Sequence, residues 1–201
     1  MIYVQYGCGL SAPDGWLNFD ASLALRIERL PVVGRFLRIT GFPPNARVGD
    51  IVRGLPVADG SARGVYASHV LEHLTLDDCR AALRNTLRML APGGVFRLIV
   101  PDLEARARRY VEGGDGNLFM RSTMLGKEAR PSIRQRASLS AHLWMWDFRS
   151  MSAELAQAGF ASIRRASFGD ADDPMFARVE ERGRFIDGEI TEVAMDARRP
   201  D

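Results

Sequence analysis

The sequence predicts an α/β protein whose β-sheet is doubly wound and mostly parallel. Segments rich in β-branched and aromatic residues alternate along the chain with segments whose apolar residues recur every three or four positions, as in amphipathic helices. The segment VFRLIV at 95–100 is apolar almost throughout. Such a strand is expected where helices cover both faces of a sheet.

The first half of the chain is expected to supply four strands and one helical region. Residues 2–6 are rich in β-formers and run directly into Gly7-Cys8-Gly9, which reads as a tight turn. The expected strands lie at 2–6, 16–20, 48–52 and 64–68, and one helix or two short ones lie within 23–39.

The second half begins with a strong helix. Thr75 followed by Asp78 resembles a capping box, and Pro92-Gly93-Gly94 ends the apolar stripe. The further expected elements are a strand at 95–100, helices at 102–112 and 151–160, and strands at 162–168 and 189–197. Residues 113–140 lack periodicity, so residues 1–201 are expected to form one domain with a lid or substrate loop around 113–147.

Composition narrows the range of functions. The chain has 201 residues, 46% of them hydrophobic and 26% charged, which is typical of a globular protein. A net charge of +2 gives no indication of nucleic-acid binding. No apolar run is long enough to span a membrane and no secretion leader is recognisable, so we expect a cytoplasmic protein without a membrane partner. The only lysine, Lys127, is followed by Glu128, which excludes a phosphate-binding G-K-[ST] loop.

Residues that directly follow the expected strands are the first candidates for ligand binding, because ligands of such sheets lie at the carboxyl ends of the strands. Gly7 and Gly9 let the backbone turn sharply there. Asp20 ends the second strand, where a carboxylate can accept both hydroxyls of a ribose, or can instead cap the next helix. Asp50 can reach an adenine amino group, or can be an ordinary turn residue.

The spacing of these residues favours a nucleoside over a dinucleotide. A dinucleotide fingerprint has three glycines, a helix, and an acid about 20 residues further on. Here Ala12 stands in place of the third glycine, and Asp20 follows Gly9 too soon to leave room for a helix that would hold a pyrophosphate. S-adenosylmethionine (SAM) has an adenosine and a sulfonium but no phosphate, so it fits this pattern.

The stretch ASHVLEHL at 67–74 matches H-x-x-E-H, a zinc-protease signature, through His69, Glu72 and His73. Such a site needs both histidines on one helix and a third ligand. Here a strand is expected to run to Ser68, which puts His69 on a turn, and the one other histidine, His142, is far along the chain. A metal hydrolase is therefore disfavoured, and we assign no metal ligand from the sequence.

Several motifs together carry a resemblance to a known family. They are VQYGCGLSAPDGWLNFD (4–20), GDIVRGLPVADGS (49–61), GVYASHVLEHL (64–74), LAPGGVFRLIVPDLE (90–104), HLWMWD (142–147) and ELAQAGF (154–160). In this order the motifs resemble the class I SAM-dependent methyltransferases, in particular the small "methyltransferase domain" subgroup with a shortened first helix.

The resemblance implies a Rossmann-like sheet of seven strands with the last one antiparallel, and SAM bound at the ends of strands one to four. It also implies cofactor contacts: the methionine side at Tyr6, Gly7, Cys8 and Gly9, the ribose at Asp20, the adenine at Asp50 and Ile51, and a contact after strand four at Ser68 and His69. Some quinone O-methyltransferases resemble the region around His69 and hold a divalent ion there with acids and a histidine.

Methyl transfer from a sulfonium needs chiefly alignment and exclusion of water, and a base only where the acceptor must lose a proton. Glu72 and His73 are the first candidates to orient or deprotonate the acceptor, and His142 is the second; helix capping and packing are the alternatives. The acceptor is expected to be a small molecule or glycan-type precursor. Ala62 and Arg63 depart from the aromatic and acid usual in relatives, which leaves a non-catalytic SAM-binding or interaction protein as the alternative function.

Overall fold

A computed structural model of the chain describes residues 2–31, 40–125 and 141–201. It contains a seven-stranded sheet in the order β3-β2-β1-β4-β5-β9-β6. The strands are β1 (Ile2–Tyr6), β2 (Leu17–Asp20), β3 (Ala46–Val48), β4 (Ala62–Ser68), β5 (Leu90–Val100), β6 (Ala161–Arg165) and β9 (Val193–Arg198). Neighbouring strands run parallel except that β9 is antiparallel to both β5 and β6. The predicted fold class, with its antiparallel last strand, is confirmed.

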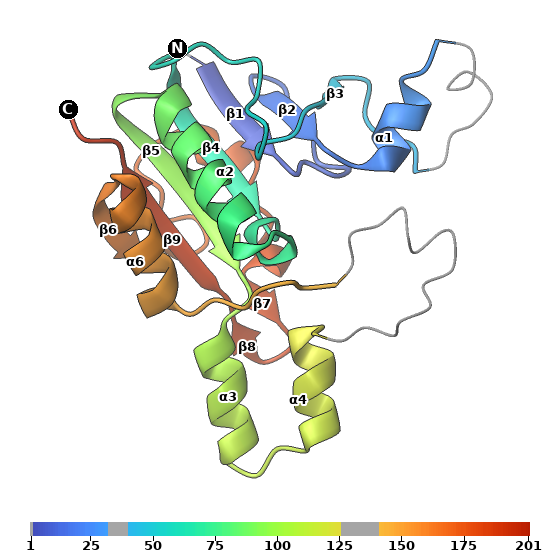
Figure 1. The fold of residues 1–201 in the computed structure, drawn as a ribbon, viewed down its shortest axis with the longest axis vertical. Helices are drawn as coiled ribbons and strands as arrows, with labels where there is room; N and C mark the ends of the chain where they lie inside the picture. The colour runs from blue at the N-terminus through green and yellow to red at the C-terminus, as the bar shows by residue number, and fades with distance from the viewer. Residues whose placement is uncertain (1, 32–39, 126–140) are drawn as a thin grey trace.

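Helices and a small hairpin surround the sheet (Figure 1). The helices are α1 (Leu23–Glu28), α2 (Leu76–Met89), α3 (Leu103–Val111), α4 (Gly116–Thr123) and α6 (Phe148–Ala158), with 3₁₀ helices η2 (Leu71–His73), η3 (Pro174–Arg178) and η4 (Arg182–Arg184). Strands β7 (Ile186–Asp187) and β8 (Ile190–Thr191) form the hairpin. Helices α3 and α4 extend beyond the end of β5, next to this hairpin (Figure 1).

The sheet buries apolar side chains on both faces, as the near-continuous hydrophobic strands predict. On one face, Val65 and Phe96 pack in the main core with Leu83 of α2 and Leu155 of α6. On the other face, Tyr66 packs in a second cluster with aromatic side chains from the loops, among them Trp16, Phe176 and Phe185. Strand β4 therefore serves both cores with successive residues, which fixes its register.

Several element boundaries differ from the predicted ones. Strand β3 is Ala46–Val48 rather than 48–52, because the chain turns directly after it. The expected strand 189–197 divides into β8 and β9, and β5 already begins at Leu90, directly after α2. Helix α6 begins at Phe148 because Asp147 and Ser150 form a reciprocal capping box before it.

The expected aperiodic segment 113–140 is partly helical. Asp115 accepts a hydrogen bond from the amide of Asn117 and so caps α4, which the sequence analysis did not predict. Residues 126–140, with most of the expected lid and Lys127, lie outside the described residues, as do 32–39 of the expected helical region 23–39. None of the helices within the described ranges combines the length and apolarity that crossing a bilayer requires.

Candidate functional site

A cavity of about 550 Å³ opens at the carboxyl ends of β1, β2 and β4. The ends of these parallel strands meet at one edge of the sheet, so the turns that follow them form its walls. Its lining residues are Tyr6, Gly7, Asp20–Ala24, Thr40, Phe42, Gly49–Ile51, His69, Val70, His73 and Leu74. The cavity therefore lies where the sequence analysis placed a cofactor.

The wall after β1 is a glycine bend that packs closely on the turn after β4. Gly7 has a φ of +65°, and a Cβ atom on it would lie 2.2 Å from Cγ2 of Val70. Gly9 also has a positive φ, and its amide donates to Oδ2 of Asp20 at 2.9 Å. The amide of Ser22 donates to the other oxygen, Oδ1, at 2.8 Å. The bend thus fixes the Asp20 carboxylate at the cavity wall, and its oxygens keep further lone pairs for a ligand.

A second carboxylate lies on the turn after β3. Oδ1 of Asp50 accepts the amide of Val52 at 3.0 Å, which closes a small turn around Ile51. Asp50 and Ile51 both line the cavity, with Phe42 from the preceding loop. This wall pairs a hydrogen-bond acceptor with apolar surface, which suits a purine ring bearing an amino group.

The charge of the cavity wall restricts its ligand. Among the described residues that line it are two aspartates and two histidines, but no arginine or lysine. A polyphosphate would meet two carboxylates there, although the exposed Arg53, which does not line the cavity, pairs with Asp50 at 3.5 Å. A ligand that carries a positive charge and hydroxyl groups is the better match.

The turn after β4 brings histidines to the same cavity. His69 adopts a left-handed φ of 54° directly after the strand, and its amide bonds the carbonyl of Ile99 at 2.9 Å. Nδ1 of His69 lies 3.3 Å from Oε1 of Glu72. Burial tends to lower the pKa of the His69 ring, but the neighbouring Glu72 carboxylate outweighs it, and the pKa is raised. Glu72 and His73 follow in η2, so the two histidines of the motif do not share an α-helix.

The segment after residue 140 packs on this turn. The carbonyl oxygen of Glu72 accepts the amides of Leu143 and Trp144 at 2.8 and 3.1 Å. These bonds place the His142 ring against the His73 ring, with centroids 5.1 Å apart. Burial lowers the pKa of His142. The fold therefore places His142 next to Glu72 and His73, although these residues are far apart in the sequence.

Comparison with known proteins identifies the domain. Residues 5–98 match the family model described as "Methyltransferase domain". Residues 5–98 therefore carry a methyltransferase domain, and this match supports a class I SAM-dependent methyltransferase. The matched range runs from β1 to β5 and so includes both aspartates and the glycine bend. The same match supports SAM as the cofactor.

Solved structures agree in fold at low sequence identity. The YcgJ protein of Bacillus subtilis is 14% identical with a TM-score of 0.55, covering 99% of this chain and 92% of the other. A SAM-dependent methyltransferase of Thermotoga maritima is 15% identical with a TM-score of 0.53, covering 98% and 82%. A Haloferax volcanii methyltransferase, solved with the activator Trm112, is 16% identical with a TM-score of 0.50, covering 100% and 83%. No curated protein sequence matches the chain.

The structure brings most of the predicted cofactor residues of this methyltransferase together. Tyr6, Gly7, Asp20, Asp50, Ile51 and His69 line the cavity, as does His73. Gly9, Cys8 and Ser68 are not among the lining residues, although the Gly9 amide holds Asp20. Phe42, Val70 and Leu74 also line the cavity and were missed. A loop aromatic such as Phe42 carries no periodic signal that would reveal its role.

Two of the predicted contacts differ in the atoms that they offer. The hydroxyl of Tyr6 points into the core, 3.3 Å from Oγ1 of Thr86, and burial raises the pKa of this phenol. The side chain of Cys8 packs with Leu25 and Ala46, and burial raises the pKa of this thiol to about 12. Only the backbone of these two residues is therefore expected to face a ligand.

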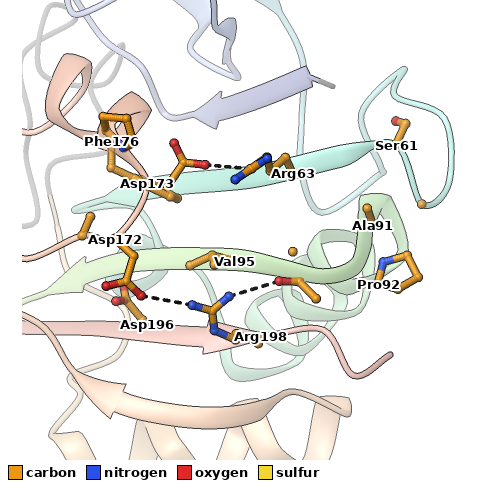
Figure 2. A pocket seen from close by; sticks show the side chains of 15 residues that line it. Ser61, Arg63, Ala91, Pro92, Val95, Asp172, Asp173, Phe176, Asp196 and Arg198 are labelled. Carbon is orange, nitrogen blue, oxygen red and sulfur yellow. Dashed lines mark hydrogen bonds and ion pairs between the residues drawn. The ribbon is translucent and has the colours of Figure 1, made fainter.

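A second cavity, of about 610 Å³, lies at the opposite edge of the sheet, where β4 and β5 begin (Figure 2). Its charged side chains pair with one another: Arg63 bonds Asp173 at 2.9 Å, and Arg198 bonds Asp172 at 3.3 Å. These charges are therefore taken up by ion pairs within the wall of this second cavity. We assign it no part in methyl transfer.

Proposed function

We propose that this methyltransferase binds SAM in the cavity at the ends of β1, β2 and β4 and transfers the methyl group to a small-molecule acceptor. In this proposal the Asp20 carboxylate accepts the ribose hydroxyls. Asp50 and Ile51 flank the adenine, and the backbone from Tyr6 to Gly9 faces the methionine portion. The observation that carries the proposal is a cavity with two fixed carboxylates and no lysine or arginine among its described lining residues.

The fit of SAM follows from the shape and the charge of the wall. Gly7 has no side chain where the bend meets Val70, so the backbone can approach a ligand closely. No helix lies between β1 and β2 in residues 7–16. A phosphate would therefore find no helix N-terminus in the loop between β1 and β2. The first turn of α1 does line the cavity, but the Ser22 amide before it already donates to Asp20.

SAM supplies a methyl group on a positively charged sulfur. The chain must then align an acceptor with that group and keep water away. Glu72, His73 and His142 form the group of side chains next to the cavity that could orient an acceptor or take its proton. The exposed side chains of Leu143 and Trp144, on the same segment as His142, offer apolar surface to such a molecule.

Isothermal titration with SAM and S-adenosylhomocysteine (SAH) tests the cofactor site. We expect micromolar binding to the wild type and a loss of about 100-fold or more in Asp20→Ala, because hydrogen bonds to a charged group contribute about 1.5–3 kcal/mol each and two are removed. Asp14→Ala, which removes an exposed aspartate from the loop between β1 and β2, is the matched control and should bind as the wild type does. Unchanged affinity in folded Asp20→Ala would show that Asp20 does not hold the ribose.

Measuring the rate of methyl transfer distinguishes residues that act on the acceptor from residues that bind the cofactor. His73→Ala is expected to bind SAH within a few-fold of the wild type but to transfer methyl more slowly to any acceptor found in a screen of hydroxyl- and amine-bearing molecules. If His73→Ala lowers SAH affinity and leaves turnover at saturation unchanged, His73 belongs to the cofactor site instead.

A further inference from the structure

The carboxylate of Glu72 is buried without a hydrogen-bond donor among the described residues. Its side chain is 0% exposed, and neither Oε1 nor Oε2 has a hydrogen-bond partner. The nearest ring nitrogens to Oε1 are Nδ1 of His69 at 3.3 Å and Nε2 of His73 at 3.8 Å, and the Glu72 carboxylate raises the pKa of the His69 ring. Burying a carboxylate costs several kcal/mol unless a cation lies beside it, and either a protonated His69 or a bound metal ion can supply that charge.

The His73 ring is oriented to offer a lone pair rather than a proton. Its Nδ1 lies 3.0 Å from the carbonyl oxygen of Ala141, and a carbonyl can only accept, so Nδ1 carries the hydrogen. In the neutral ring Nε2 is then unprotonated, and it is this atom that faces Glu72. A histidine whose far nitrogen donates to a backbone carbonyl is the usual arrangement of a metal ligand.

His142 repeats this arrangement from the other side. Its ring nitrogen Nε2 bonds the backbone of Thr123. Within the part of the chain that the structure describes, Nδ1 of His142 has no hydrogen-bond partner, and the residue is only 7% exposed. One ligand atom each from Glu72, His73 and His142 lies within 4.8 Å of the others.

We propose that Glu72, His73 and His142 bind one divalent transition-metal ion of the Zn²⁺ class. Two imidazole nitrogens and one carboxylate oxygen suit such an ion better than Mg²⁺, which prefers oxygen ligands and retained waters. Ligands at about 2.0–2.2 Å around a tetrahedral ion lie roughly 3.4 Å apart. The present spacing of up to 4.8 Å must shorten to that value when an ion binds.

Three protein ligands leave a coordination position open, as in catalytic rather than structural zinc sites. His73 also lines the SAM cavity, so the ion lies beside the proposed path of the acceptor. There it would bind the acceptor oxygen and lower its pKa, which makes an acceptor hydroxyl or phenol the substrate class. This role rests on the proposed function, whereas binding of the ion does not.

Titration of the metal-free protein, without an affinity tag, tests the site with Zn²⁺ and Co²⁺. We expect one ion per chain and a Co²⁺ visible spectrum of four- or five-coordinate nitrogen and oxygen ligation without thiolate bands. Glu72→Gln, His73→Gln and His142→Gln should each weaken binding about 100-fold or more. Glu189→Gln, a change of an exposed carboxylate, is the matched control and should bind as the wild type does. Stoichiometric binding that survives all three ligand changes, or no binding to the wild type, would overturn the proposal.

Thermal unfolding separates loss of a ligand from loss of the fold. Because Glu72→Gln removes a buried carboxylate and keeps its shape, the metal-free variant is expected to melt at or above the metal-free wild type. Zn²⁺ should raise the melting temperature of the wild type but not that of the variant. An equal rise in both proteins would refute the assigned ligands.

SAH titration distinguishes this proposal from the proposed function. We expect metal-free wild type and Glu72→Gln to bind SAH alike, because Glu72 does not line the SAM cavity. Zinc binding without SAH binding would leave the metal site standing and refute the cofactor site. The reverse result would refute the metal site alone.

Discussion

Replacing Gly7 with alanine tests how the bend after β1 is built. At a φ of +65° an alanine is strained by about 1–2 kcal/mol, because its Cβ crowds the following carbonyl. The new Cβ would also lie 2.2 Å from Cγ2 of Val70, well inside contact distance. Relieving such overpacking costs about 1–3 kcal/mol more. We therefore expect Gly7→Ala to lower the free energy of unfolding by about 2–5 kcal/mol, measured by urea denaturation without ligand.

Gly9→Ala is the matched control, because Gly9 also has a positive φ but a Cβ there meets nothing within 4 Å. It should lose only the strain, about 1–2 kcal/mol. In a double-mutant cycle, Val70→Ala should recover most of the difference by making room for the new methyl group. If Gly7→Ala is as stable as Gly9→Ala, or if the cycle shows no coupling, the close packing of the bend on the turn after β4 is not real.

Two further predictions concern ionisation and thiol chemistry. Burial opposes ionisation of Asp170, but hydrogen bonds from Arg97 and Arg164 outweigh this effect and lower the pKa of the carboxyl group. The ionised carboxylate therefore stabilises the fold above the ordinary pKa near 4, and this stabilisation is lost as the pH falls through the lowered pKa. Asp170→Asn should therefore unfold at a lower urea concentration than the wild type at pH 6 but lose less stability between pH 6 and 3; an unchanged pH dependence would contradict this. Burial raises the pKa of both Cys8 and Cys79 to about 12. Both thiols should therefore react with a disulfide reagent only after the protein is unfolded in urea. Rapid reaction of the native protein would contradict their burial.

The sequence predicts the sheet well because its signals are local. An apolar strand, or a helix that ends near Pro-Gly-Gly or at Gly159, depends on only a few neighbouring residues. Accordingly, β1, β4 and α2 lie close to where these signals place them. Asp20 was found in the same way, since its position depends only on the strand that it ends. Boundaries moved where a capping side chain decided them, as Asp147 does for α6.

The histidine cluster could not be predicted because its assembly is not local. Nothing in the residues around His142 indicates that the amides of Leu143 and Trp144 bond the carbonyl of Glu72. The long sequence separation between His142 and the H-x-x-E-H motif therefore argued against His142 as a third metal ligand. In the folded chain His142 lies beside the motif, so that objection no longer holds. The Tyr6 hydroxyl is the opposite case: its position next to the glycine bend suggested a cavity contact, whereas the pleat of β1 turns it toward Thr86.

A crystal structure of the protein with bound SAH tests the central claim most directly. We expect the nucleoside in the cavity at the ends of β1, β2 and β4, with both ribose hydroxyls within hydrogen-bond distance of the Asp20 carboxylate. Density for the ligand in the cavity around Arg63 and Arg198, or a ribose that makes no contact with Asp20, would contradict it.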